Sequence, residues 1–351
     1  MIKMLILAPL RIAASYLWRE VLPLPSRAAV LVFVLAILGL PYLVNDPYFL
    51  RIAIMTSIFS VFAASWDFLS SYSGQVSFGH ALFFGVGAYS SAMLNHHLGW
   101  NPWLTLPLGG GVAMISGVMV GYLCQRLRGS YLSLATLSFP LILTGLLFLF
   151  PEASGGELGV SGLTPLVRSR VGFYYVVVLA MLVLNFGLWK LGDSKIGLIL
   201  HAIREDEVAA RASGINTVRY KVMAFAVSAL VAGLSGGLLA HFIRSVGPST
   251  LEVALSFQAV IWGIFGGVAT IYGPILGVFL LYPFTELLSL FGSISEYRLL
   301  MFALVVLLVL IFMPEGITPW IRDKLETECR RCKSPNVFTR HECRICQADL
   351  R

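Results

Sequence analysis

The chain has 351 residues, of which 58% are hydrophobic and 12% are charged, whereas charged residues make up roughly 25% of an ordinary soluble domain. Repeated apolar runs of about twenty residues are long enough to cross the roughly 30 Å hydrocarbon core of a bilayer. These features exclude a soluble globular protein. They predict an all-α integral membrane protein, since no alternating strand pattern indicates a barrel.

The N-terminal segment 1–27 does not have the pattern of a signal peptide. Arg11 interrupts its apolar run, and no cleavage site of small residues follows. The segment is predicted either to lie along the inner membrane surface as an interfacial helix or to be a frayed leader.

Residues 28–321 are predicted to form a polytopic helical bundle of about ten spans. Asp67, near the inner end of the second span, is expected to be wetted. The expected spans are 28–44, 49–70, 76–95, 103–125, 130–150, 172–190, 221–243, 254–270, 272–292 and 297–313.

The distribution of basic residues predicts how the bundle is oriented. If the N-terminus is inside, the inside segments 1–27, 126–128, 190–221 and 322–351 hold 20 of the 25 Lys and Arg residues. This distribution is the positive-inside bias. The net charge of +7 is therefore explained by membrane topology and does not indicate nucleic-acid binding. The chain is predicted to be a multi-pass protein of a bacterial plasma (inner) membrane, with both termini cytoplasmic.

Residues 73–89 combine four closely placed glycines with Gln, Ser and His side chains at membrane depth. Polar groups within a span usually face a bundle interior or a water-filled path, and the opening Ser73-Gly74 permits a broken helix. The predicted solute-path residues are Gln75, Ser77, Gly79 and His80. The alternative is a tight helix–helix seam. Weaker echoes at 263–267 and 272–277 could mark an inverted internal repeat.

The loop 191–220 is a charged island between apolar segments, and ten charged residues lie from Lys190 to Lys221. Residues 205–213 are predicted to form one helix that begins with three acidic residues, contains a Glu207–Arg211 pair and stops at Gly214. One face would carry the small apolar residues Val208, Ala212 and Ile215, suited to a groove on a partner. The alternative is a solvated connector.

Three segments of the chain resemble the permeases of branched-chain amino acid ABC importers (the LivM-like family): 73–81, 202–216 and 268–277. Within the island, Ala209-Ala210-x-x-x-Gly214 looks like the coupling loop of ABC importer permeases. Glu207 lies one residue further from Ala209 than the strict Glu-Ala-Ala pattern places it. The resemblance covers roughly residues 45–315.

The resemblance implies a transporter subunit that is not an enzyme and binds no nucleotide, and the sequence contains no G-x-x-x-x-G-K-[ST] phosphate loop. It implies a second permease of related fold, two ABC ATPase subunits and an extracytoplasmic solute-binding protein as partners. The mechanism implied is ATP-driven alternating access. The residues implied for ATPase coupling are Arg204, Glu205, Asp206, Glu207, Val208, Ala209, Ala210 and Gly214.

The tail, residues 322–351, holds four of the five cysteines, Cys329, Cys332, Cys343 and Cys346, as two CxxC pairs separated by ten residues. Four thiolates suit tetrahedral zinc, and a metal can stabilise a segment too short to bury a core. The tail is therefore predicted to be a zinc-ribbon-like module whose spacer folds back as a hairpin. The alternatives are two disulfides, a redox pair or rubredoxin-like iron.

Two other functions stay open at this point. The same architecture could import urea or short amides, because nothing in the spans names the cargo. A membrane sensor or enzyme with a zinc ribbon would need a catalytic cluster in the spans, and the six histidines are not at ligand spacing. A nucleic-acid scaffold is disfavoured because the tail has no aromatic stacking platform beyond Phe338.

Overall fold

The computed structural model describes residues 25–43, 46–127, 129–290 and 296–329, together with 332, 335–337, 343 and 346. The predicted N-terminal segment 1–27 lies almost entirely outside the described residues. Internal contacts divide the chain into a unit of residues 46–316 and a unit formed by the two ends of the chain. The predicted domain boundaries at 27 and 321 stay predictions.

The 46–316 unit is almost entirely helical. Its elements are α3 (Pro47–Asp67), the π-helix η2 (Phe68–Tyr72), α4 (Ala81–Leu98), α5 (Pro102–Leu123), η3 (Cys124–Arg126), α6 (Ser130–Leu149), α7 (Pro151–Ser154), β1 (Val160–Ser161), α8 (Arg170–Gly192), α9 (Lys195–Glu205), α10 (Glu207–Ala212), α11 (Thr217–Ile243), β2 (Ser245–Val246), η4 (Pro248–Leu251), α12 (Val253–Gly266), α13 (Tyr272–Leu288) and α14 (Arg298–Phe312). The other unit contains α2 (Pro25–Leu43), α15 (Ile317–Leu325), β3 (Glu326–Glu328) and β4 (Pro335–Val337).

The predicted helical membrane bundle is confirmed. Among the described residues, six helices are long and apolar enough to cross a membrane, and shorter apolar helices include α12 and α13. Each predicted span corresponds to a helix of the structure, although the count of ten membrane crossings stays a prediction.

Helix α3 is the centre of the 46–316 unit. Its most apolar window is 94% buried, compared with 72% for α11 and 28% for α6. Neighbours α8, α11, α12 and α13 pack around it. The outer helices instead expose large side chains such as Leu299, Leu304 and Ile311 of α14. In a membrane protein these exposed apolar faces meet lipid or another subunit.

Glycines bring α4, α5 and α11 into close contact. A Cβ added at Gly87 of α4 would lie 2.2 Å from the carbonyl oxygen of Gly233 in α11, and one at Gly109 of α5 would lie 2.6 Å from the Gly87 oxygen. Small residues at such positions let backbones approach and gain van der Waals contact where no hydrophobic force acts between helices. The three helices therefore form a tight seam.

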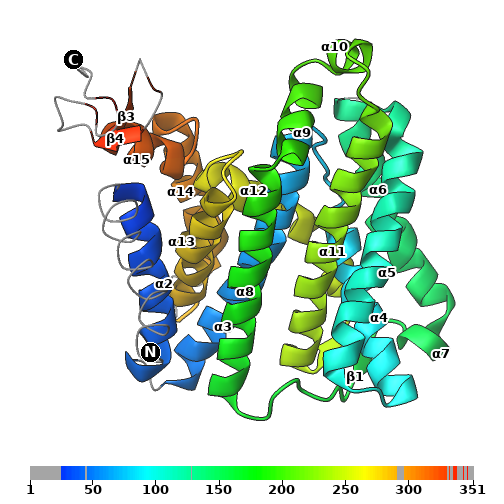
Figure 1. Cartoon of the computed structure of the whole chain (residues 1–351). Helices are drawn as coiled ribbons and strands as arrows, with labels where there is room; N and C mark the ends of the chain where they lie inside the picture. The colour runs from blue at the N-terminus through cyan, green and yellow to red at the C-terminus, as the bar shows by residue number, and fades with distance from the viewer. Residues whose placement is uncertain are drawn as a thin grey trace, which may run out of the picture. The chain divides into compact units, whose positions relative to one another are not determined.

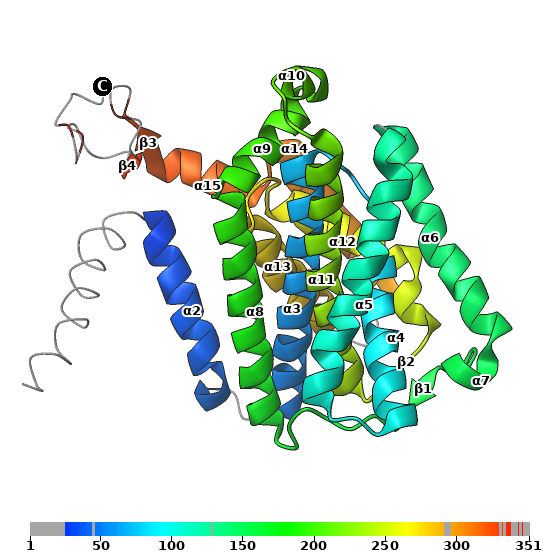
Figure 2. The same ribbon diagram turned by 45° about the vertical axis from the view of Figure 1, so that its right-hand side comes forward.

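The two ends of this unit differ in character. Helices α9 and α10 lie at one end, and β1 and α7 lie at the other (Figures 1 and 2). Strand β1 pairs antiparallel with β2 in the register Val160↔Val246. Beside it, His241 of α11 contacts Ser91 Oγ of α4 through Nε2 (2.9 Å) and the Thr164 carbonyl through Nδ1 (2.8 Å). The 155–169 loop is thus bound to the bundle.

Candidate functional site

The helical chain is interrupted between α3 and α4, where the sequence permits a broken helix. The π-helix η2 ends at Tyr72, and α4 begins at Ala81, five residues later than the expected start of that span. Other helices hold the non-helical stretch. Phe78 N donates to Thr136 Oγ1 (3.1 Å), Ser133 Oγ donates to the Val76 carbonyl (2.9 Å) and Ala81 N donates to Ser256 Oγ (2.8 Å). These bonds replace the helical bonds that the break removes.

The predicted solute-path residues all lie in this stretch and are buried. The His80 ring contacts Ser65 Oγ through Nε2 (2.9 Å), and Ser73 Oγ donates to Gln75 Oε1 (3.1 Å). A Cβ at Gly79 would lie 1.8 Å from the Thr136 carbonyl oxygen. Gly79 therefore serves close packing against α6, while the polar side chains beside it face the interior.

Several buried polar atoms near the break have no hydrogen-bond partner. Among the described residues these include Asp67 Oδ2, Ser70 Oγ, Ser77 Oγ and His80 Nδ1. Such atoms are rare in folded proteins, and each requires an explanation such as a ligand, a water or a moving part. Their concentration between residues 67 and 80 distinguishes this stretch from the apolar helices around it.

The expectation that Asp67 is wetted is wrong. Its side chain is completely buried, accepts a hydrogen bond from Ser71 Oγ, and accepts another from Ala269 N (3.1 Å). Ala269 lies in the turn between α12 and α13, about 200 residues away in sequence, with a left-handed φ of 62°. The chain supplies donors from a distant turn, which the local sequence cannot indicate.

The charged island folds as two helices, which corrects the single helix predicted over 205–213. Glu205 is the last residue of α9, the backbone turns at Asp206, and α10 runs from Glu207 to Ala212. Asp206 is the N-cap, because its Oδ1 accepts from Val208 N (2.8 Å) and Ala209 N (3.0 Å). Gly214 has the left-handed φ of 83° expected of a helix stop.

Glu207 joins α10 to the start of α11. Its carboxylate accepts from Arg211 Nη2 (2.9 Å), which confirms the predicted pair, and from Lys221 Nζ (2.7 Å). Thr217 Oγ1 also donates to it (3.3 Å). The carboxylate therefore fixes the orientation of α10 relative to the start of α11.

Helices α9 and α10 expose apolar side chains among their charged ones, although the pair projects from the end of the bundle. Val208 is 65% exposed and Leu198 72% exposed, and Ala209 and Ala212 are exposed as well. Ala210, by contrast, is buried. A projecting helix pair with small apolar side chains outward has the form of a docking surface.

Arg204 is predicted to take part in ATPase coupling, but its side chain also contacts the bundle. Its Nη1 donates to the carbonyl of Ser71 in η2 at 2.6 Å, across 133 residues of sequence. On the preceding turn of α9, the His201 ring packs on the Tyr72 ring with centroids 4.8 Å apart. Burial of the His201 ring, with the positive charge of Arg204 nearby, lowers its pKa from the ordinary 6.5. Sequence reasoning missed these contacts because no motif pairs the two segments.

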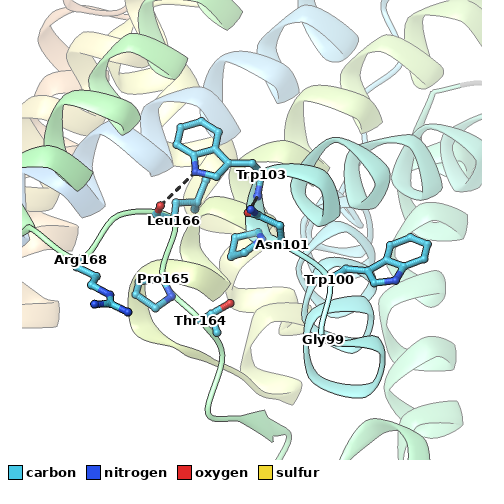
Figure 3. A pocket seen from close by; sticks show the side chains of 9 residues that line it. Gly99, Trp100, Asn101, Trp103, Thr164, Pro165, Leu166 and Arg168 are labelled. Atoms are coloured by element: carbon cyan, nitrogen blue, oxygen red, sulfur yellow. Dashed lines mark hydrogen bonds between the residues drawn. The ribbon is translucent and has the colours of Figure 1, made fainter.

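A pocket of about 490 Å³ lies at the opposite end of the unit from α9 and α10. Figure 3 shows Trp100, Trp103 and Arg168 around it; Trp103 Nε1 donates to the Leu166 carbonyl (3.2 Å). Asn95 connects two parts of its lining, because it donates to the Trp100 carbonyl and to Thr164 Oγ1, both at 2.7 Å. The pocket therefore has a rigid, partly aromatic wall. Sequence reasoning did not single out these residues.

The four tail cysteines form one cluster, as predicted. Their sulfurs all lie within 4.8 Å of one another, and the closest approaches cross between the CxxC pairs: Cys329 to Cys346 at 3.5 Å and Cys332 to Cys343 at 3.4 Å. A disulfide would require about 2.05 Å. The hairpin encloses the first CxxC, because β3 pairs with β4 in the register Glu328↔Pro335, so only its second strand comes from the predicted spacer.

A helical membrane bundle with a broken helix and a projecting helix pair is the architecture of a transport permease. Residues 48–311 match the family described as the branched-chain amino acid transport system permease component. The chain belongs to this family. It is a permease component of an ABC-type transporter, not an enzyme, and a multi-pass inner-membrane protein.

Individual relatives agree with this assignment. The chain is 32% identical over 311 residues to the high-affinity branched-chain amino acid permease protein LivM of Salmonella typhimurium, covering 80% of this chain and 72% of the relative. It is 32% identical to LivM of Escherichia coli, with coverages of 78% and 71%. The fructose import permease protein FrcC of Rhizobium meliloti is 27% identical, with coverages of 60% and 63%. No solved structure matches the chain.

Proposed function

We propose that this chain is the transmembrane subunit of an importer that moves branched-chain amino acids into the cytoplasm, driven by ATP that separate subunits hydrolyse. The observation that carries this proposal is the projecting pair α9–α10, with Val208 and Ala209 exposed on its outer surface. An ATPase subunit would receive this surface in a groove. Two such ATPases, a second permease of related fold and an extracytoplasmic solute-binding protein complete the proposed assembly.

The polarity of the chain supports the proposed orientation. The segment that carries α9 and α10 is one of those richest in Lys and Arg, and this bias supports a cytoplasmic position for it. The pocket beside Trp100 and Trp103 then faces outward, where the binding protein delivers its solute. Between these ends, the break at 73–80 supplies the polar groups of the proposed path, Gln75, Ser77 and His80, with Gly79 packing beside them.

An uptake experiment tests the cargo. Cells lacking their own leucine uptake would express the whole assembly and be given labelled leucine, urea, fructose or ribose. We expect leucine uptake that unlabelled isoleucine and valine inhibit, because two relatives that are 32% identical to the chain are named for branched-chain amino acids. Uptake of urea or a sugar without leucine would reject this cargo, and the sugar arms matter because FrcC and a ribose permease are also related.

A co-isolation experiment tests the docking surface. Val208→Glu places a charge on the apolar surface of α10 and should abolish recovery of the ATPases with the purified chain. Leu158, which is 94% exposed at the opposite end, provides the matched control, and Leu158→Glu should leave ATPase recovery unchanged. Normal ATPase recovery with Val208→Glu would reject this surface of α10 as the docking site, and failure of the wild-type chain to recover any ATPase would argue for a sensor or enzyme that works without ATPases.

We propose that the four tail cysteines hold one zinc ion. A tetrahedral site with Zn–S bonds of about 2.3 Å separates its sulfurs by about 3.8 Å, and the sulfur distances of 3.4 and 3.5 Å lie close to this value. Cys329 and Cys343 are buried, whereas Cys332 is exposed, so a bound metal would be shielded from water on one side. Zinc would act as a structural tie for a segment with little core.

Metal analysis of the purified full chain tests this assignment. We expect one zinc per chain, lost in a Cys329→Ser/Cys343→Ser variant and retained in Cys124→Ser, since Cys124 is buried in the permease bundle. Stoichiometric iron would indicate a rubredoxin-like centre, and the absence of reactive thiols without metal would indicate disulfides.

A further inference from the structure

The coupling element α9 is fastened to the end of α3 by the side chain of Arg204. Its guanidinium donates to the Ser71 carbonyl at 2.6 Å. Its methylene stem lies on Gly74, where an added Cβ would be 3.1 Å from Arg204 Cγ. Gly74 has a left-handed φ of 70° and leaves room for the stem. Both contacts fall on the boundary between η2 and the broken stretch 73–80.

The connection continues from Ser71 into the core. Ser71 also donates through its hydroxyl to Asp67 Oδ1, and the same oxygen accepts from Ala269 N at 3.1 Å. Ala269 belongs to the turn between α12 and α13. Three consecutive hydrogen bonds therefore connect the cytoplasmic element α9 with two places in the bundle, the end of α3 and the α12–α13 turn.

The structure around these bonds is closely packed. A Cβ at Gly266 would lie 1.8 Å from the Gly273 carbonyl oxygen, so the α12–α13 turn is closely packed and would move as one piece. Asp67 is fully buried, and a buried carboxylate holds its donors firmly because losing them is costly. Energetic coupling travels through such packed, hydrogen-bonded networks.

We propose that Arg204, Ser71 and Asp67 form a relay that transmits movement of α9 at once to the broken stretch 73–80 and to the α12–α13 turn. This inference rests on the proposed function, because it assumes that an ATPase moves α9. In this relay Arg204 is a positioning residue that acts through the bond from its guanidinium to Ser71. Any contact that it makes at the docking surface is additional. The inner end of the solute path would then open and close as the stretch 73–80 and the α12–α13 turn move together.

The test uses the complete assembly in proteoliposomes and measures two quantities, ATP hydrolysed and leucine imported. Their ratio reports coupling, whereas a change that only weakens folding lowers both quantities together. Arg204→Met keeps the stem and removes the guanidinium. It should still hydrolyse ATP, but leucine imported per ATP should fall roughly two- to thirtyfold. Arg219→Met, an exposed arginine at the start of α11, is the control and should keep the wild-type ratio.

Ser71→Ala tests the middle of the relay without touching α9. The Ser71 carbonyl that Arg204 binds remains, and only the bond to Asp67 is lost, so the ratio should fall here too. Ser57→Ala is the matched control, since Ser57 is a buried serine of α3 whose Oγ donates to the Ala53 carbonyl of its own helix, and it should not change the ratio. If the two residues act in one relay, Arg204→Met combined with Ser71→Ala should be no worse than Arg204→Met alone within about a factor of two.

The outcomes separate the relay from the proposed function. A wild-type assembly that fails to import leucine, or imports it without hydrolysing ATP, would overturn the proposed function. A wild-type assembly that works, with Ser71→Ala at the wild-type ratio, would overturn the relay alone. Effects of Arg204→Met and Ser71→Ala that multiply in the double variant would also overturn it. The Ser71→Ala comparison decides the question even if Arg204→Met does not assemble.

Discussion

At the scale of single residues, Glu207 shows how burial changes the contribution of an ion pair to stability. It binds two cations, but Lys221 is 8% exposed and Arg211 is 59% exposed. An exposed pair contributes little because water screens it and the side chains lose entropy. A shielded pair is costly to break, since the remaining charge is left without its partner. The Glu207–Lys221 ion pair should therefore contribute much more to the free energy of unfolding than the Glu207–Arg211 pair.

Substitution of the two cations tests this difference. Lys221→Met leaves the shielded side of Glu207 without its cation and should lower the free energy of unfolding by roughly 2–4 kcal/mol. Arg211→Met should change it by less than about 0.5 kcal/mol. Thermal unfolding of the purified full chain in one detergent would compare them. Equal effects of the two substitutions would contradict the argument.

His201 makes the packing of α9 depend on pH. Burial and the Arg204 charge lower its pKa below the ordinary value of 6.5, so the folded state favours the neutral ring more than the unfolded state does. The contribution of His201 is therefore fully present above pH about 6.5 and is lost as the pH falls through the lowered pKa.

Hydrogen exchange of residues 195–205, corrected for the intrinsic rate, would measure this effect. We expect the protection of α9 to fall as the pH decreases below about 6.5 in the wild-type chain and to stay constant in His201→Gln. His97→Gln, at the other end of the unit, should behave like wild type. Loss of protection that persists in His201→Gln would assign the pH dependence to another group.

At the scale of elements, the glycine seam decides how closely α4, α5 and α11 approach. Gly87→Ala would place a Cβ against the Gly233 backbone at 2.2–2.5 Å. Because both partners are main chain, neither can rotate away, and the helices would have to separate. Overpacking of this kind costs typically 1–3 kcal/mol.

Gly111→Ala provides the control, because nothing lies within 4 Å of its added Cβ. In α5 this substitution should be neutral or stabilise by up to about 1 kcal/mol through helix propensity. Gly87→Ala should instead lower the unfolding temperature and reduce transport. The comparison is made by thermal unfolding and leucine uptake; an unchanged Gly87→Ala chain would show that the seam is loose.

At the scale of the whole molecule, the proposed metal site and the permease bundle belong to different units. All four cysteine ligands lie in the unit formed by the chain ends, and the family match ends at residue 311. The tail therefore lies outside the residues that match the family, and the proposed metal would stabilise it separately from the bundle.

Removal of the metal should affect the tail and spare the bundle. With a strong chelator, we expect trypsin to cleave after basic residues of the 322–351 segment. The untreated chain should stay intact over the same digestion time. The unfolding temperature of the 46–316 unit should stay within about 2 °C, because none of its residues is a ligand. A Cys329→Ser/Cys343→Ser chain should be cleaved with or without chelator. A large fall in the unfolding temperature of the bundle would show that the units depend on each other.

The sequence by itself determined the membrane class, the approximate positions of the apolar helices, the charged island and the clustered cysteines, and it permitted the break after Ser73-Gly74. Each of these follows from a local sum of hydropathy, from charge, or from the spacing of a few residues. Only the tertiary structure decided that Asp67 is buried against Ala269, that the island bends at Asp206, that Gly87 meets Gly233 and that Arg204 turns inward to Ser71. These contacts join residues far apart in sequence or depend on the space that neighbouring helices leave. The packing of the whole bundle therefore sets them, and no local pattern records it.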